Sequence, residues 1–439
     1  PFPTACALIC EHPCEARCRR NMLDSSVNIR GLKRYAVDNA GVVPAPVCGP
    51  STGKRVAIVG GGPSGLSAAY YLQLMGHSCT VFELRPKLGG MLRYGIPNYR
   101  FPRERLQEDI DCILSTGVEI KYNTKIGESL TIDDLRRQYD AVYVSIGAQS
   151  DKKVGIEGEE SKNVYSAVDL LGSIGSDNPP DFTGKRVVVI GGGNTAMDTA
   201  RAAKRCDGVE HVYLVYRRTK RYMPAAEDEL LEVLEEGVEF KELLSPVSLE
   251  NGRLICQKME LGQMDASGRA GVTETADVEE VPADTVIVAV GEKLDTDFYT
   301  ANQIAVDERG RAKVNDKTLE TSVSGVYVAG DGAKGAATIV EGIRDAQLAV
   351  KDILGKEITR DAAVTGKEAD CYAKKGILKH SEEVKTEEER CLTCNKVCEN
   401  CVDVCPNRAN ISVKVPGMAM NQVIHVDYMC NECGNCKSF

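Results

Sequence analysis

The chain has 439 residues, more than one hydrophobic core usually organises, so two or three domains are expected. Its 54 basic and 64 acidic side chains give a net charge of −10, which argues against nucleic-acid binding, because such surfaces are basic. No run of about 18 apolar residues occurs, so no membrane span is expected.

The cysteines are concentrated at the two ends of the chain. Four lie between Cys6 and Cys18, and eight lie between Cys391 and Cys436. Secreted disulfide scaffolds are usually much shorter chains. Two dense clusters around an ordinary middle therefore indicate metal or cluster sites in a reducing cytoplasm. Because the first residue is Pro1 rather than Met, we expect a cut or processed amino end.

Residues 1–50 are expected to form a cysteine-rich segment followed by a proline-containing linker. Its cysteines recur every four residues, a spacing that would line one face of a continuous helix. They are candidate metal ligands or, alternatively, free cysteines buried on a helix face. The residues concerned are Cys6, Cys10, Cys14 and Cys18.

A glycine turn follows the linker, between an expected strand that ends at Val59 and a helix that starts at Pro63. Its G-x-G-x-x-G pattern permits a tight turn, a close approach to a pyrophosphate and helix packing on the strand. The next strand ends in Glu83, whose carboxylate can accept hydrogen bonds from ribose hydroxyls. The alternative is a turn that needs glycine for backbone reasons alone. The candidate residues are Gly60, Gly62, Pro63, Ser64, Gly65 and Glu83.

A second glycine turn has the pattern G-x-G-x-x-A and ends at Ala196. The strand after it carries two arginines where an acid would suit NAD. Two guanidinium groups can pair with a 2′-phosphate, so this turn is expected to bind NADP(H). A solvated basic pair is the alternative. The candidate residues are Gly191, Gly193, Asn194, Thr195, Arg217 and Arg218.

A third motif, "SGVYVAGDGA", places an apolar strand before a Gly-Asp pair, and a helix is expected to begin at about Ala337. An Asp at a strand end can bond a ribityl hydroxyl, and a helix N-terminus can face the negative charge of a reduced flavin ring. The three motifs together suggest FAD at the first turn and NADPH at the second. The candidate residues of this motif are Gly330, Asp331 and Thr338.

The stretches "GGGPSGLSAAYYL", "FELRPKLGGMLRYGIPNYRFP", "GGGNTAMDTAR", "VYRRTKRYMPA", "ADTVIVAVG" and "GVYVAGD" resemble the small subunit of glutamate synthase and the flavin half of dihydropyrimidine dehydrogenase. The resemblance implies an α/β fold of two Rossmann-like domains, with an NADPH domain (156–290) inserted in an FAD domain (51–155 and 291–355). It implies that the first turn, Glu83 and Asp331 bind FAD, that the second turn and the arginine pair bind NADPH, and that Gly90 lies in a flavin-contacting loop.

The same resemblance implies an α-helical amino-terminal segment and two 4Fe–4S clusters held partly by its cysteines. Family ligands also lie upstream of this run. In the family, one cluster also takes a non-cysteine ligand shortly after this run. In this chain Lys33 and Arg34 lie at that place, and both are poor iron ligands. We therefore expect that the residues present do not complete both clusters.

Residues 356–390 are charged and predict a connecting helix, and residues 391–439 form a second cysteine module. Its patterns, C-x3-C-x2-C-x3-C-P and C-x2-C-x2-C, indicate a ferredoxin-like 4Fe–4S domain. Zinc is the alternative, because C-x2-C pairs also bind zinc. The candidate ligands are Cys394, Cys398, Cys401, Cys405, Cys430, Cys433 and Cys436.

In two-cluster ferredoxins the fourth cysteine of each run ligates the other cluster. One cluster would then be held by Cys405 and the last three cysteines of the chain. The other would be held by Cys394, Cys398 and Cys401 and would need a fourth ligand just beyond Phe439, for which Cys391 is a weak substitute. We expect a fragment cut at both ends. The tail resembles the family of selenate reductase subunits, in which a glutamate-synthase-like module carries a ferredoxin tail; nothing in these residues indicates selenate.

Together these features predict a cytoplasmic NADPH-dependent flavoprotein oxidoreductase that relays electrons through FAD and 4Fe–4S clusters to a partner subunit or missing domain. The hydride step needs no catalytic side chain, because the cofactors supply the chemistry. One alternative is a flavin disulfide reductase, which the lack of a vicinal cysteine pair in the middle domains disfavours. Others are a non-catalytic docking module, and reversed or bifurcating flow from reduced ferredoxin.

Overall fold

The computed structural model describes residues 1–22, 25–128, 130–176, 178–180, 182, 185–264, 269–358, 383–391, 407–413, 415–416 and 422–432. The chain divides into two compact units. The first contains residues 1–5 and 44–358, and the second contains residues 6–43 and 359–439. Among the described residues, no helix combines the length and apolar character that crossing a membrane requires.

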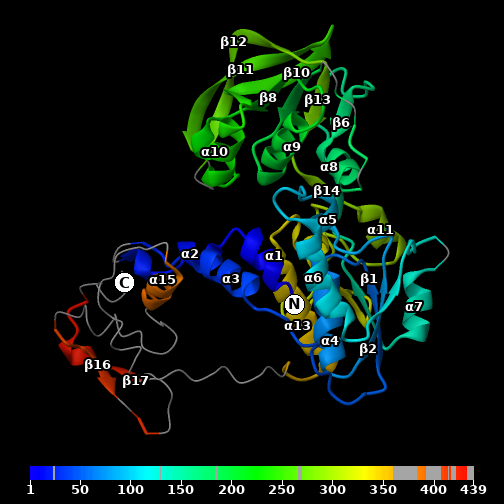
Figure 1. The fold of residues 1–439 in the computed structure, drawn as a ribbon, viewed down its shortest axis with the longest axis vertical. Coiled ribbons are helices and arrows are strands. Elements are labelled where there is room, and N and C mark those ends of the chain that lie inside the picture. Colours follow the sequence, from blue (N-terminus) through cyan, green and yellow to red (C-terminus); the bar gives the residue numbers. More distant parts are fainter. Residues whose placement is uncertain are drawn as a thin grey trace. The chain divides into compact units, whose positions relative to one another are not determined.

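The first unit contains a parallel sheet, the first sheet, with strand order β15-β4-β1-β2-β3 (Figure 1). Its inner strands β1 and β4 are largely apolar, as parallel strands buried on both faces usually are, and Val56, Ala57 and Ile58 are fully buried, whereas the edge strand β3 reads Glu-Ile-Lys. The strands are β1 (Arg55–Val59), β2 (Ser78–Phe82), β3 (Glu119–Lys121), β4 (Ala141–Val144) and β15 (Val326–Val328).

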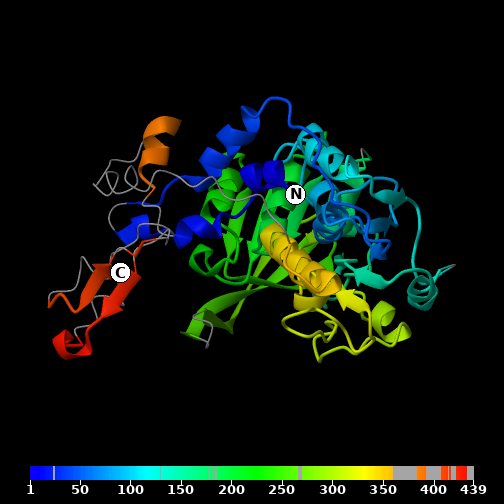
Figure 2. The ribbon, with the colours of Figure 1, turned by 90° about the horizontal axis from the view of Figure 1, so that it is seen from below.

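The helices connected with the first sheet include α13, drawn in gold in Figure 2, which packs against α4. Helix α13 begins at a capping box between Thr338 and Glu341 and ends at Gly355, a left-handed C-cap. The first sheet and these helices form the first half of the unit. The helices are α4 (Pro63–Leu74), α5 (Met91–Tyr94), α6 (Arg103–Leu114), α7 (Ile132–Gln138), α11 (Thr296–Ala301), α12 (Asp331–Lys334) and α13 (Ile339–Leu354).

A second parallel sheet has the order β6-β13-β7-β8-β9, and its central strands are equally apolar. Two parallel sheets with crossover helices confirm the predicted α/β class with Rossmann-like folds. The strands are β6 (Val164–Ser166), β7 (Arg186–Ile190), β8 (His211–Tyr216), β9 (Glu239–Glu242) and β13 (Thr285–Val288). The helices are α8 (Ala167–Gly175), α9 (Asn194–Lys204), η2 (Lys220–Tyr222) and α10 (Glu227–Glu235).

An antiparallel sheet that the sequence did not indicate packs against this second sheet, and both belong to the second half. Its strands are β10 (Leu244–Glu250), β11 (Arg253–Met264) and β12 (Ala270–Pro282). The chain passes between the halves through an antiparallel pair, β5 (Ala148–Asp151) and β14 (Glu292–Leu294). Two short strands therefore carry the backbone connection.

The second unit joins segments from the two ends of the chain. The Asn28 amide donates to Glu387 Oε1 at 2.7 Å, and the fully buried Arg390 donates to the Ser25 carbonyl at 2.6 Å. The elements of the amino-terminal segment are α1 (Pro3–Leu8), α2 (Pro13–Ala16), η1 (Arg19–Met22) and α3 (Ile29–Asp38). The carboxyl-terminal elements are α15 (Val384–Glu389), β16 (Asn410–Val413), β17 (Gln422–His425) and η3 (Asp427–Met429).

Of the predicted connecting helix over residues 356–390, the structure describes α15 and the non-helical residues 356–358 after the cap of α13. Residues 359–382 lie outside the described part. In the predicted ferredoxin-like module, β16 pairs antiparallel with β17.

Candidate functional site

The first glycine turn joins β1 to α4 and leaves no room for a side chain at Gly60 or Gly65. A Cβ on Gly65 would lie 2.1 Å from the Gly60 carbonyl oxygen, and one on Gly60 would lie 2.4 Å from the Ser145 carbonyl oxygen. Gly60 also has a φ of +103°, which favours glycine. Gly62 is the N-cap of α4 and Pro63 its first residue, so the free amides of the helix start face the space beyond the turn. This arrangement can receive an anion.

Glu83 follows β2 and lies against the same turn. Its Oε2 accepts the Gly61 amide at 2.7 Å, and its Oε1 accepts the Arg85 amide at 2.8 Å. Burial raises the pKa of Glu83, while these two amides oppose that change. Each carboxylate oxygen has a further lone pair for a hydroxyl donor. The residue therefore fits a ribose beside the turn.

The loop after Glu83 returns to the first turn. A Cβ on Gly90 would lie 2.8 Å from the Cα of Gly62, and Gly90 has a φ of +51°. The backbone of this loop thus passes directly over the helix start. Gly90 is the N-cap of α5, which brings a second set of helix-start amides close to the first turn.

Gly330 and Asp331 follow β15 and lie beside α4. The Cβ position of Gly330 is 3.3 Å from the Ser64 Cβ, and Ser64 Oγ is 2.7 Å from the Tyr143 hydroxyl. Asp331 Oδ1 accepts the Ala337 amide at 3.1 Å. Burial, reinforced by neighbouring carboxylates, raises the pKa of Asp331 to about 6. The first turn and the Gly-Asp motif therefore share one edge of the first sheet.

Thr338 caps α13, so this helix begins two residues after the predicted start. Its hydroxyl donates to Glu341 Oε2 at 3.0 Å, and its amide donates to the same oxygen at 3.1 Å. This pairing fixes the helix start near the Gly-Asp motif.

The second glycine turn joins β7 to α9 and repeats this construction. A Cβ on Gly191 would lie 2.3 Å from the Ala289 carbonyl oxygen, and one on Gly192 would lie 2.4 Å from the Tyr216 ring. The Cβ position of Gly193 has its nearest neighbour at 4.0 Å. Asn194 is the first residue of α9, and its Oδ1 accepts the Ala226 amide at 3.0 Å. The side of the turn at Gly193 is therefore open for a phosphate.

The two arginines directly follow β8, the neighbour of β7. Arg217 is exposed. Arg218 Nε donates to the Ala270 carbonyl at 2.8 Å, so part of its guanidinium is engaged by the start of β12. The two residues are thus not equivalent, and Arg217 is the better placed to meet a ligand phosphate.

Glu292 lies between the two turns and was missed by sequence reasoning. It stands on β14, and its Oε1 accepts the Thr195 hydroxyl at 3.1 Å. Its negative charge also helps to raise the pKa of Asp331. The second turn and the Gly-Asp motif are therefore electrostatically coupled through this carboxylate. Its only sequence signal is its place directly after the apolar strand and Gly291.

The described cysteines of the amino-terminal segment do not converge. Helix α1 ends at Leu8 and α2 begins at Pro13, so the four-residue spacing does not fall on one helix. Among the residues that the structure describes, no three His, Cys, Asp or Glu side chains form a metal site. The role of these four cysteines as cluster ligands therefore stays a prediction: Cys6, Cys10, Cys14 and Cys18.

The carboxyl-terminal candidates fall mostly outside the described residues. Cys430 is described and partly buried. The others lie in the undescribed part: Cys394, Cys398, Cys401, Cys405, Cys433 and Cys436.

Two of the described middle cysteines, Cys79 and Cys256, are poorly suited to disulfide exchange. Cys79 and Cys256 are buried, and burial raises the pKa of Cys256 to about 12. Burial also raises the pKa of Cys79. A reactive cysteine needs the opposite shift, because the thiolate is the nucleophile.

Residues 54–352 match the family described as pyridine nucleotide-disulphide oxidoreductase. The chain is also 34% identical over 379 residues to the glutamate synthase [NADPH] small chain of Escherichia coli, covering 80% of each. The chain belongs to this oxidoreductase family and, within it, to the group of the glutamate synthase small chain.

Other relatives are longer than this chain. It is 38% identical over 461 residues to the oxidoreductase YgfK of Escherichia coli, covering all of this chain and 44% of that protein. It is 38% identical to the NADPH-Fe(3+) oxidoreductase subunit beta of Geobacter sulfurreducens, covering 80% of this chain and 58% of that protein. The chain thus spans about half the length of these curated relatives.

Solved structures show the same fold. Mycobacterium tuberculosis FprA in complex with NADPH has a TM-score of 0.60 at 23% identity, covering 69% of this chain and 84% of FprA. The thioredoxin reductase of T. acidophilum has a TM-score of 0.51 at 20% identity, covering 69% of this chain and 98% of that chain.

Proposed function

We propose that this chain takes electrons from NADPH, holds FAD at the first turn, and delivers electrons to a partner subunit or domain. The observation that supports this most is the pair of glycine turns on two connected parallel sheets, one beside Glu83 and one beside Arg217. FAD, when bound, would accept a hydride, that is two electrons and one proton, from NADPH, which becomes NADP⁺.

The protein's own residues would bind and orient the two nucleotides. Glu83 would accept the ribose hydroxyls of FAD, and Asp331 would bond a ribityl hydroxyl. Gly193 would admit the NADPH pyrophosphate to the start of α9, and Arg217 would pair with the 2′-phosphate. No side chain of this set has to transfer a proton in the hydride step.

The onward route is proposed from the cysteine pattern and from the relatives. Two relatives carry the printed names of beta subunits, of an NADP(+)-dependent formate dehydrogenase and of an NADPH-Fe(3+) oxidoreductase. We propose that the carboxyl-terminal module holds 4Fe–4S clusters, in a reducing cytoplasm, and that a partner receives the electrons. The proposed electron route does not involve the amino-terminal cysteines, of which the structure brings no three together with each other or with other candidate ligands among the described residues.

The test is anaerobic purification of the full-length protein, followed by metal analysis and addition of NADPH. The proposal expects bound flavin, iron and acid-labile sulfide, with the flavin reduced by NADPH. Zinc alone would contradict the cluster assignment, and a bound flavin that NADPH leaves oxidised would favour a docking module without catalysis.

A further inference from the structure

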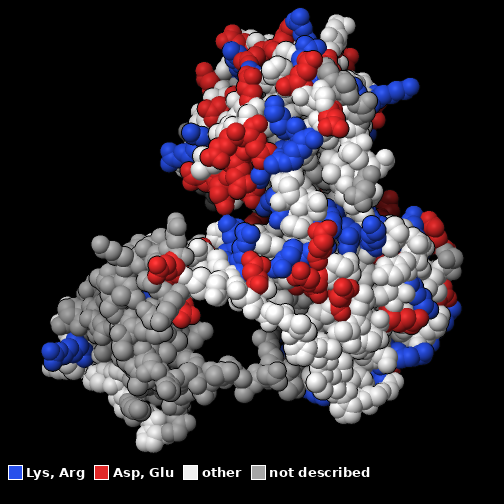
Figure 3. Space-filling view, in the orientation of Figure 1, with Lys and Arg blue, Asp and Glu red and all other residues white. Residues whose placement is uncertain are grey.

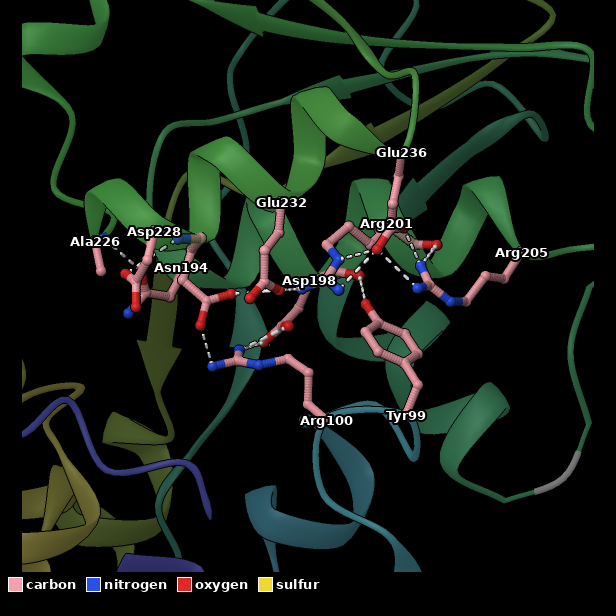
Figure 4. Close-up of polar contacts among 11 residues, drawn as sticks. Tyr99, Arg100, Asn194, Asp198, Arg201, Arg205, Ala226, Asp228, Glu232 and Glu236 are labelled. Carbon is pink, nitrogen blue, oxygen red and sulfur yellow. Dashed lines mark hydrogen bonds and ion pairs between the residues drawn. The ribbon is translucent and has the colours of Figure 1, made fainter. Parts of the chain in front are cut away.

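The loop between α5 and α6 belongs to the first half but places two side chains against the second half. Tyr99 and Arg100 contact helix α9, and Arg100 also contacts α10 (Figure 4). The base of this loop is fixed in its own half, because Phe101 is fully buried and Arg103 donates to the Leu92 carbonyl at 3.0 Å. The loop is therefore a firm support for the two side chains.

Arg100 joins two carboxylates of the second half. Its Nη1 lies 2.7 and 2.6 Å from the two Asp198 oxygens, and its Nη2 donates to Glu229. The side chains of Arg100, Asp198 and Glu229 are only 17%, 7% and 12% exposed. A charged hydrogen bond at such burial is much stronger than one at the surface.

Tyr99 fills the neighbouring space on α9. Its hydroxyl donates to the Asp198 carbonyl at 3.3 Å, and the Arg205 and Arg201 guanidinium carbons lie 3.8 and 4.9 Å from its ring centroid. Arg201 in turn pairs with carboxylates of α10, including Glu236 at 2.7 Å. The tyrosine ring therefore docks on a cationic surface that α10 holds in place.

Acidic side chains gather over α10, as Figure 3 shows for its outer face. Burial raises the pKa values of Asp198 and Glu229, and the Arg100 charge opposes this change in both. Without Arg100, two buried carboxylates would lose a shared cation, and removing one partner of a buried pair is strongly unfavourable. The contact of Arg100 with Asp198 and Glu229 therefore favours the one orientation of the two halves in which these side chains meet.

The clamped helices are those that build the second turn. Asp198 lies one helical turn after Asn194 on α9, and Asn194 accepts the Ala226 amide at the start of α10. The supporting loop follows α5, whose N-cap Gly90 touches the first turn. A continuous set of contacts therefore runs from one nucleotide turn to the other. Only two short strands, β5 and β14, connect the halves through the backbone.

We propose that Tyr99 and Arg100 are positioning residues that hold the NADPH turn in the orientation from which hydride reaches the flavin. This inference rests on the proposed hydride transfer. Neither residue has to touch the reacting atoms. Because hydride can transfer only from the productive orientation, loosening this clamp should make the orientation of the two halves the slow step, and should affect the rate more than nucleotide binding.

The experiment is anaerobic rapid-mixing reduction of the FAD-loaded full chain by NADPH and by NADPH deuterated at the transferred hydrogen. Wild type is compared with Arg100→Ala, Arg100→Lys, Tyr99→Phe and the control Arg136→Ala, an arginine of α7 that pairs with Asp133 in its own half. At saturating NADPH, Arg100→Ala should reduce flavin more slowly by on the order of ten- to a hundredfold.

We expect less than about a threefold change in NADPH dissociation constant, and a smaller isotope effect because domain orientation limits the rate. Arg100→Lys should recover part of the rate, and Tyr99→Phe, which loses only the hydroxyl donor, should fall between. If Arg100→Ala does not fold, these two conservative variants decide the outcome.

A wild-type rate and isotope effect in Arg100→Ala, or in both conservative variants where Arg100→Ala is lost, would overturn the inference. A slow rate with an unchanged isotope effect would also overturn it, because the chemical step itself would then be impaired. Failure of the wild type itself to be reduced would instead refute the proposed function.

Discussion

Asp331 lies in a buried corner with Glu292, Glu341 and Asp345 as negative neighbours. Its carboxyl is next to the place proposed for the flavin ribityl chain, and its Oδ1 already accepts the Ala337 amide. The pKa of about 6 means that the folded protein retains a proton there above the pH at which an unfolded chain loses it. Stability of the FAD-free protein should respond to this difference.

The sign follows from the raised pKa of an acid. The protonated Asp331 carboxyl contributes to the stability of the folded protein at low pH. This contribution is lost as pH rises through about 6, which lowers the unfolding free energy by about 3 kcal/mol in total. Asp331→Asn cannot ionise, so the unfolding free energy of this variant should rise relative to that of wild type by about 2 kcal/mol between pH 4.5 and 8, since about 1 kcal/mol is already lost in wild type at pH 4.5. Urea unfolding of the FAD-free protein measures the gap. The exposed Asp316→Asn is the control, and a gap that stays constant with pH would contradict the assignment.

Arg217 and Arg218 follow one strand but have different surroundings, because Arg218 is engaged by the Ala270 carbonyl. Arg217→Ala should raise the Michaelis constant for NADPH on the order of tenfold, since a charge-assisted pair with the 2′-phosphate is lost. The constant for NADH should change little. Steady-state kinetics with both nucleotides checks this, and Arg253→Ala on the neighbouring antiparallel sheet is the control. Equal effects on NADPH and NADH would remove the NADP assignment.

At the scale of elements, the glycines of the second turn have different structural roles. At Gly191, a Cβ would strike the Ala289 carbonyl and φ is +156°, whereas the Cβ position of Gly193 is open. Gly191→Ala should therefore lower the unfolding free energy of the nucleotide-free protein by about 1 kcal/mol or more. Gly193→Ala should leave that energy nearly unchanged but weaken NADPH binding, because the methyl group occupies the approach of the pyrophosphate.

Chemical unfolding and calorimetric titration of NADPH separate these two effects. The same loss of stability in both variants would show that the turn needs glycine only for its backbone. Full NADPH affinity in Gly193→Ala would show that the phosphate binds elsewhere.

The strands and turns of both parallel sheets could be predicted because their signals are local. Runs such as Val56–Val59 precede glycines at fixed spacing, and a helix follows within a few residues. The start of α13 differed by two residues because the Thr338 capping box sets it. The four-residue cysteine spacing did not produce one helix, since Pro13 starts a new one.

The clamp and Glu292 could not be predicted, because their partners lie far away in sequence. Arg100 meets Asp198 across 98 residues, and Thr195 meets Glu292 across 97. A lone charged residue usually indicates a solvated surface, and only the tertiary fold shows that Arg100 is mostly buried and that Glu292 accepts a hydrogen bond from Thr195. The antiparallel sheet of the second half likewise depends on long-range packing, although its strands alternate in burial.

At the scale of the whole molecule, the division into two units assigns separate roles. The unit of residues 1–5 and 44–358 contains both nucleotide turns and the clamp. The other unit collects the cysteine-rich segments from both ends of the chain, joined by contacts such as that of Arg390 with Ser25. The two glycine turns and the cysteine-rich segments thus lie in different compact units, which is consistent with the proposed delivery of electrons away from the nucleotide sites.

The most direct measurement is the flavin absorbance of the full-length, anaerobically purified protein as NADPH is added in equivalents. We expect the oxidised-flavin band to disappear stoichiometrically with added NADPH, and to respond much more weakly to NADH at equal concentration. We also expect a paramagnetic signal from reduced clusters as electrons leave the flavin. A flavin that stays oxidised in the presence of bound NADPH would contradict it.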